Sequence, residues 1–82
     1  MADNHPTVLV IEDEAQIRRF LRVQLTANGY RLIEAITAQE GLVQAATRQP
    51  EVVILDLGLP DLDGLEVMRR LREWTTVPII VL

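Results

Sequence analysis

The chain has 82 residues, of which 49% are hydrophobic, so it has room for one small domain with a packed core. Its formal net charge is −4 and its eight basic residues are all arginines, a balance that argues against nucleic-acid binding by this segment. Cysteine is absent, no apolar run approaches the ~20 residues that span a membrane, and the N-terminus lacks signal-peptide features, so we expect a cytoplasmic protein without disulfides.

The N-terminal third predicts a strand followed by a helix. Residues 1–6 are a polar lead-in, and Thr7-Val-Leu-Val-Ile11 is a continuous apolar run, which is typical of a buried strand in a parallel sheet. A helix is predicted over residues 14–28, ending near Gly29. Its inward face should carry four apolar residues: Ile17, Phe20, Leu21 and Leu25. Its outward face should carry three arginines that point to water or, as the less favoured alternative, to a partner: Arg18, Arg19 and Arg22.

The next segment predicts an edge strand and a second helix. Residues 31–35 form a shorter, more polar strand, which suits the edge of a sheet. Thr37 and Glu40 match a capping box, in which the threonine caps an amide and the glutamate reaches back. The helix they open should run to about Arg48, with three residues inward: Leu42, Ala45 and Ala46.

The C-terminal part predicts two more strands around a third helix. Val52-Val-Ile-Leu55 is a second continuous apolar run, and a turn containing Gly58 follows it. A helix over residues 65–74 should bury Leu65, Met68 and Leu71, and residues 77–82 read as a fourth strand. The order β-α-β-α-β-α-β indicates an α/β fold built from right-handed crossover units on a parallel sheet.

Two of the buried strands end in acids. Glu12 and Asp13 follow the first strand, and Asp56 follows the third. If these strands are neighbours, the three carboxylates converge at the mouth of the sheet, and their mutual repulsion calls for a cation. Oxygen ligands of this kind suit Mg²⁺, beside which a carboxylate can accept a phosphoryl group. Asp61 and Asp63 are expected to be solvated loop acids.

At these residues the chain resembles the receiver domain of two-component response regulators. The matching segments are Ile11-Glu12-Asp13-Glu14 and Leu55-Asp56-Leu-Gly-Leu-Pro60-Asp61, with Gly64. The resemblance implies a flavodoxin-like three-layer fold whose parallel sheet has the order 2-1-3-4. Within the family, Ala45-Ala-Thr-Arg48 and Leu71-Arg-Glu-Trp74 are most similar to the potassium-responsive regulators, whose receivers are joined to a winged-helix DNA-binding domain.

The resemblance also implies a role for each acid. Asp56 corresponds to the aspartate that a sensor histidine kinase phosphorylates, Asp13 to the direct Mg²⁺ ligand, and Glu12 to the acid that holds Mg²⁺ through water. Gly58 would supply its backbone carbonyl to the metal. The implied function is a switch that controls transcription through a DNA-binding domain outside this segment.

The resemblance ends within the fourth strand. Receivers continue with a Ser or Thr and a lysine that contact the phosphoryl group, so residues 7–82 are expected to be a partial receiver, truncated before the fifth strand and impaired in phosphorylation. An open apolar edge would favour a homodimer or strand-exchanged oligomer. The alternative is a folding fragment with a vestigial site that assembles by strand exchange. An aspartate-nucleophile phosphatase would need a second acid where Gly58 stands, so we expect no enzyme.

Overall fold

The computed structural model describes residues 5–82, so the part of the predicted lead-in at residues 1–4 lies outside the described residues. Strands and helices alternate in the predicted order: β1 (Thr7–Ile11), α1 (Ala15–Ala27), β2 (Arg31–Ala35), α2 (Ala38–Arg48), β3 (Val52–Leu55), α3 (Gly64–Arg72) and β4 (Ile79–Val81). No helix within residues 5–82 combines the length and apolar character that crossing a membrane requires.

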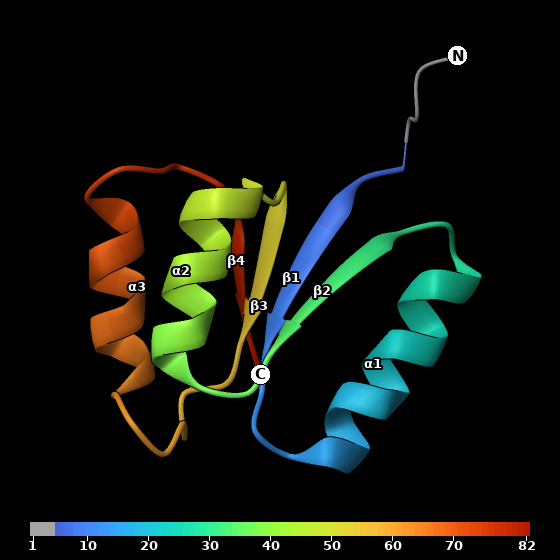
Figure 1. Ribbon diagram of the computed structural model, residues 1–82, viewed down its shortest axis with the longest axis horizontal. Helices are drawn as coiled ribbons and strands as arrows, with labels where there is room; N and C mark the ends of the chain where they lie inside the picture. Colours follow the sequence, from blue (N-terminus) through green and yellow to red (C-terminus); the bar gives the residue numbers. More distant parts are fainter. Residues whose placement is uncertain (1–4) are drawn as a thin grey trace.

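The four strands form one parallel sheet with the order β2-β1-β3-β4, which confirms the predicted topology. β1 lies between β2 and β3, with Ile11 level with Ala35 on one side and Leu55 on the other. β2 and β4 are the edge strands, as predicted for β2. All strands run toward the lower end of the molecule in Figure 1, so their carboxyl ends lie at one edge.

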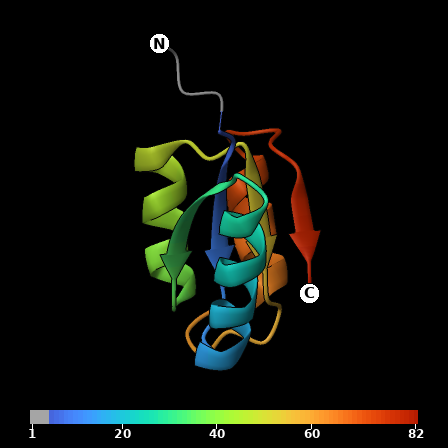
Figure 2. The same ribbon diagram turned by 90° about the vertical axis from the view of Figure 1, so that its right-hand side faces the viewer.

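Helices cover both faces of the sheet and make three layers. α1 lies on one face, and α2 and α3 lie on the other (Figures 1 and 2). Because successive strand residues point to opposite faces, Leu9 and Ile11 enter the core beneath α2 and α3, whereas Val8 and Val10 face α1. The core under α2 and α3 is the larger, and it includes the fully buried Val67.

α1 is less buried than its sequence pattern predicts. None of its residues is buried, and Phe20 is 62% exposed and Ile17 38% exposed. Only Leu21 and Leu25 pack on the small cluster formed by the sheet. The prediction for Phe20 and Ile17 is wrong because α1 is alone on its face and packs chiefly against the edge strand β2, so a single narrow stripe contacts the sheet.

α2 meets the sheet through small residues. Its buried positions are Ala38, Gly41 and Ala45, whereas Ala46, predicted to face inward, is exposed. A side chain at Gly41 would bring its first carbon within 3.0 Å of three side-chain carbons of Ile11, so glycine permits the close approach of α2 to β1.

The capping box of α2 is present with one difference. The Thr37 hydroxyl accepts the Glu40 amide at 3.1 Å, as predicted. The Glu40 carboxylate accepts the amide of Ile36 at 2.8 Å, one residue before the cap. Both bonds satisfy amides at the helix start, so the local pattern correctly located this end.

α3 begins one residue and ends two residues earlier than predicted. It runs from Gly64 to Arg72 and buries Val67 and Leu71, whereas Leu65 is 60% exposed. Asp63 caps the helix by accepting the Leu65 amide at 3.0 Å. The inward stripe consists of Gly64, Val67 and Leu71 at helical spacing, so Met68 is only partly buried and Leu65 points to solvent.

Candidate functional site

Three carboxylates meet where β1 and β3 end. Glu12 and Asp13 directly follow β1, and Asp56 directly follows β3. One carboxylate oxygen from each of these residues lies within 4.8 Å of the other two. Glu12 is only 2% exposed, Asp56 is partly buried, and Asp13 is exposed. The structure therefore brings together the three acids that the sequence predicted to converge.

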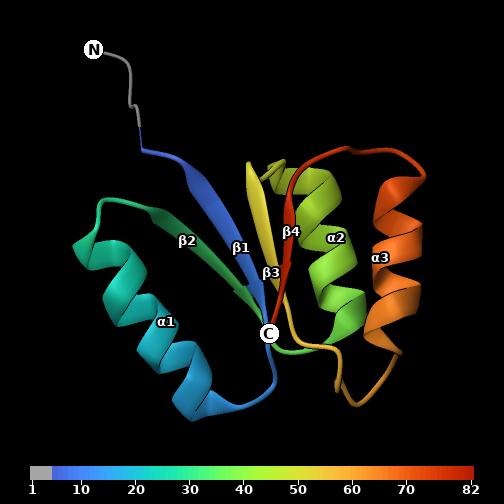
Figure 3. The same ribbon diagram turned by 180° about the vertical axis from the view of Figure 1, so that it is seen from behind.

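The backbone holds these residues in place by continuing the sheet past its last strand residues. The Asp56 amide donates to the Ile11 carbonyl at 3.0 Å, and the Glu12 amide donates to the Ala35 carbonyl at 3.0 Å. These bonds fix the start of each loop relative to its neighbouring strand. The loops themselves lie together at the lower end of the molecule in Figure 3.

The cluster carries more negative charge than its surroundings balance. Burial is the main cause that raises the pKa of Glu12, and the nearby Asp56 and Asp13 raise it further. A hydrogen bond from the Glu14 amide to Glu12 Oε2, at 3.0 Å, opposes this rise. A divalent cation would relieve the repulsion, and a set of carboxylate oxygens is the chemistry that Mg²⁺ prefers.

Gly58 orients the Asp56 side chain through its backbone. Its amide donates to Asp56 Oδ1 at 3.0 Å, across a tight turn. A side-chain carbon at Gly58 would lie 3.7 Å from the same oxygen, an ordinary contact, so the turn does not need glycine for space. Both findings are compatible with a contribution from the Gly58 backbone, and the metal role of its carbonyl stays a prediction.

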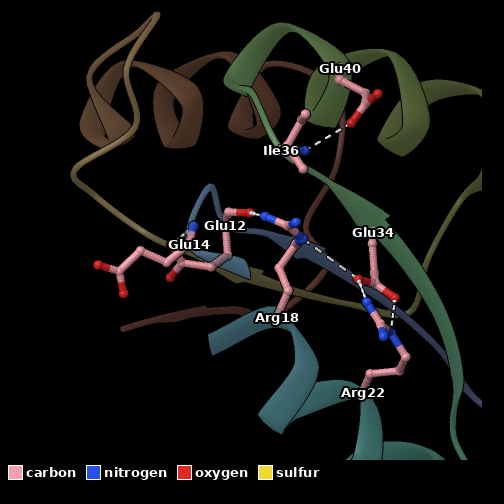
Figure 4. Close-up of polar contacts among 7 residues, drawn as sticks. All are labelled: Glu12, Glu14, Arg18, Arg22, Glu34, Ile36 and Glu40. Atoms are coloured by element: carbon pink, nitrogen blue, oxygen red, sulfur yellow. Dashed lines mark hydrogen bonds and ion pairs between the residues drawn. The ribbon is translucent and has the colours of Figure 1, made fainter. Parts of the chain in front are cut away.

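An arginine from α1 reaches the loop between β1 and α1, which carries Glu12 and Asp13 (Figure 4). Arg18 Nη1 donates to the Glu12 carbonyl at 3.0 Å, and its Nε lies 3.7 Å from Glu34 Oε1. Arg22 donates to both Glu34 carboxylate oxygens, at 2.7 and 2.9 Å. The hydrogen bonds from Arg22 are the main cause that lowers the pKa of Glu34, and the charges of Arg22 and Arg18 lower it further. The prediction of a water-facing side chain is wrong for Arg18, which is 17% exposed and binds the Glu12 carbonyl after β1, whereas Arg22 stays 50% exposed while it pairs with Glu34 of β2.

A family model of the response regulator receiver domain matches residues 8–82. The chain belongs to this family. It is 60% identical over 75 residues to the KDP operon transcriptional regulatory protein KdpE of Escherichia coli. The match covers 92% of this chain and 33% of that protein. It is 56% identical to the transcriptional regulatory protein KdpE of Mycobacterium tuberculosis, with the same two coverages. The receiver therefore spans about one third of the length of these relatives.

Solved receivers share the fold. The chemotaxis response regulator CheY4 of Vibrio cholerae matches with a TM-score of 0.91 and 26% identity, over 95% of this chain and 68% of that one. The receiver domain of the Francisella response regulator 1452 matches with a TM-score of 0.89 and 29% identity, over 94% and 64%. The family match favours the receiver interpretation over a folding fragment with a vestigial site. The predicted similarity to the Kdp regulators is also confirmed.

The receiver contains one loop contact that sequence reasoning missed. Asp61 accepts the amides of Ala38 and Gln39 at 2.8 and 3.0 Å, and these two bonds, that of Gln39 foremost, lower the pKa of Asp61. Asp61 and Asp63 are exposed loop acids, as expected, but each also caps a helix, and Asp63 caps α3. An aspartate just before a predicted helix signals a cap, so Asp63 was detectable. Asp61 had no local signal, since its partners lie more than 20 residues away.

Proposed function

We propose that Asp56 is the phosphoacceptor of this receiver and that a sensor histidine kinase is the donor. The observation that supports the proposal is the convergence of Glu12, Asp13 and Asp56 within 4.8 Å at the carboxyl ends of neighbouring strands. Receiver domains bind Mg²⁺ at an acidic pocket, and this cluster has the matching donor chemistry. Asp13, Asp56 and the Gly58 carbonyl would hold the ion directly, and Glu12 would hold it through water.

The transfer requires little from the protein beyond position and charge. A carboxylate oxygen of Asp56 attacks the phosphorus of a phosphohistidine on the kinase. The new P–O bond forms as the P–N bond breaks, and the leaving imidazole nitrogen keeps the electron pair. The Gly58 amide orients the Asp56 carboxylate for this attack. When bound, Mg²⁺ supplies positive charge that offsets the carboxylates and the phosphoryl oxygens.

In the whole protein, phosphorylation would control transcription in the cytoplasm. The relatives named above are transcriptional regulators, about three times as long as the segment they share with this chain. DNA binding is assigned to a separate domain, because this segment has a net charge of −4. The receiver acts as the switch and is not itself an enzyme acting on a separate substrate.

A homodimer or a strand-exchanged oligomer stays part of the proposal. β4 lies at the edge of the sheet, and Ile80 and Val81 are 52% and 42% exposed. An apolar edge strand with open backbone groups favours pairing with another chain. Sedimentation velocity at about 1–100 µM, the range of dissociation constants for weak self-association, measures this directly, and a monomer throughout would contradict it.

Intact mass spectrometry after incubation with phosphoramidate and Mg²⁺ tests the phosphoacceptor. We expect one phosphoryl adduct on the wild-type chain, none on Asp56→Ala, and an adduct on the control Asp63→Asn. Calorimetric titration with Mg²⁺ tests the metal, and Asp13→Asn should abolish the binding. An adduct that persists in Asp56→Ala would refute the assignment of Asp56.

A further inference from the structure

The loop between β3 and α3 is fastened to a different helix by one side chain. Asp61 lies in this loop, five residues after Asp56, and accepts the amides of Ala38 and Gln39 at 2.8 and 3.0 Å. Those amides belong to the first two residues of α2. The same loop contains Asp56 and Gly58, so the segment that forms one side of the acidic cluster is anchored to α2.

The bonds to Asp61 satisfy amides that the helix cannot satisfy itself. The first four amides of an α-helix have no partner within the helix. At the start of α2 the Thr37 hydroxyl accepts the Glu40 amide, and Asp61 accepts the two amides before it. A carboxylate there gains charge-assisted hydrogen bonds and a favourable interaction with the helix dipole. Movement of the loop away from α2 would therefore expose two unpaired amides.

These contacts and two backbone hydrogen bonds connect the three loops that follow β1, β2 and β3. The Asp56 amide binds the Ile11 carbonyl, and the next residue of that strand end, Glu12, binds the Ala35 carbonyl at the end of β2. α2 begins three residues after Ala35, and Asp61 returns the connection to the loop of Asp56. All three loops at the mouth of the sheet are thereby tied to one another, and Asp61 makes the only side-chain bonds from the β3–α3 loop to α2 within residues 5–82.

We propose that Asp61 is a positioning residue that couples cation binding at Glu12, Asp13 and Asp56 to the N-terminus of α2. The inference rests on the proposed function, because it takes the cluster to be a Mg²⁺ site. Coupling between two sites is reciprocal, so Mg²⁺ should strengthen the bonds from Asp61 to α2, and loss of those bonds should weaken Mg²⁺ binding by the same factor.

The chain offers a matched pair of variants. Asp61→Asn and Asp63→Asn each remove one negative charge from the same loop, and each alters a helix cap. Asp63 accepts a single amide, that of Leu65, within its own helix, whereas Asp61 reaches α2. Asparagine keeps one acceptor oxygen and caps helices about as well as aspartate, so both variants should fold. Circular dichroism checks this before either is used.

Two measurements test the coupling: calorimetric titration with Mg²⁺, and hydrogen exchange of the Ala38 and Gln39 amides with and without Mg²⁺. We expect Asp61→Asn to weaken Mg²⁺ binding by about tenfold, a size typical of coupled sites, and Asp63→Asn to change it by less than about twofold. Mg²⁺ should slow exchange at both amides in the wild type and in Asp63→Asn, and slow it less in Asp61→Asn, which keeps only one of the two acceptor oxygens.

Each alternative outcome refutes a distinct statement. Equal weakening by both variants would show an effect of loop charge alone and overturn the coupling. Unchanged Mg²⁺ affinity in Asp61→Asn, with faster exchange at Ala38, would show a helix cap without coupling. A folded wild-type chain that binds no Mg²⁺ would refute the proposed metal site itself, and the coupling with it.

Discussion

Replacing Asp56 by asparagine should make the metal-free protein more stable. Asparagine has the same shape as aspartate, and its side-chain oxygen can still accept the Gly58 amide that now binds Asp56 Oδ1 at 3.0 Å. The substitution therefore removes a charge and little else. That charge lies close to two others, those of Glu12 and Asp13.

The magnitude follows from the separation of the charges. Two unit charges at the 4.8 Å limit of the cluster repel by ~3.5 kcal/mol at an effective dielectric constant of ~20, and by ~1 kcal/mol in water. Glu12 is buried, but Asp13 is exposed, so the cluster lies between these two environments. We expect Asp56→Asn to raise the free energy of unfolding by about 1–2 kcal/mol in the absence of divalent cations.

Urea unfolding in a chelating buffer and in excess Mg²⁺ measures the effect. Ligand binding to the folded state adds about 2.7 kcal/mol when the free ligand is at 100 times its dissociation constant, so Mg²⁺ should stabilise the wild type far more than Asp56→Asn. Glu14→Gln is the control, because Glu14 is an exposed acid of the same loop region outside the cluster. If Asp56→Asn were no more stable than Glu14→Gln without metal, the repulsion argument would fail.

Four further substitutions test the packing and the ion pairs. Gly41→Ala should destabilise the fold by about 1–2 kcal/mol despite the better helix propensity of alanine, because the added carbon would overlap Ile11. Leu71→Ala should cost about 2–5 kcal/mol and Leu65→Ala less than about 0.5, since Leu71 is fully buried and Leu65 is 60% exposed. Glu34→Gln should lower stability by ~1 kcal/mol at neutral pH. The stability difference between Glu34→Gln and the wild type should shrink in acid. Because folding lowers the pKa of Glu34, its carboxylate stabilises the fold fully above the ordinary pKa of a glutamate. This stabilisation is lost as the pH falls through the pKa of Glu34 in the folded state.

Chemical denaturation at several pH values measures the effects of all four substitutions. A Gly41→Ala variant as stable as the wild type would show that α2 shifts freely on β1. Equal costs at the two leucines would contradict the observed orientation of α3. A Glu34→Gln deficit that does not change with pH would mean that the ion pairs with its arginine partners contribute nothing to folding.

Much of the fold could be predicted because its strongest signals are local or periodic. The continuous apolar run of β1 identified a doubly covered strand, and the pair Thr37 and Glu40 located the start of α2. The convergence of the acids needed only one additional step, the adjacency of β1 and β3, which the family resemblance supplied. Chemistry at the end of a buried strand is therefore predictable once the strand order is known.

Contacts between loops and helices distant in sequence could not be predicted in this way. Arg18 was assigned to the outward face of its helix, yet it binds the Glu12 carbonyl and lies beside Glu34. Helical periodicity assumes a helix that lies squarely on the sheet, whereas α1 packs chiefly against the edge strand β2, which carries the acidic Glu34. The capping role of Asp61 could not be predicted for a related reason, since its partner amides come within reach only when α2 packs beside its loop.

The two faces of the sheet differ in how extensively their helices are buried. The loop that carries Glu12 and Asp13 leads into α1, the less buried helix. α2 and α3 each bury three residues, whereas α1 buries none and contacts the sheet through Leu21 and Leu25. Few buried contacts mean a low free energy of local opening. We therefore expect amides in the middle of α1 to exchange faster than those of α2 and α3, and protection of α1 equal to α2 would contradict this. Arg18 therefore contributes a specific contact to a helix with little buried surface, because it joins α1 to the Glu12 carbonyl beside the acidic cluster.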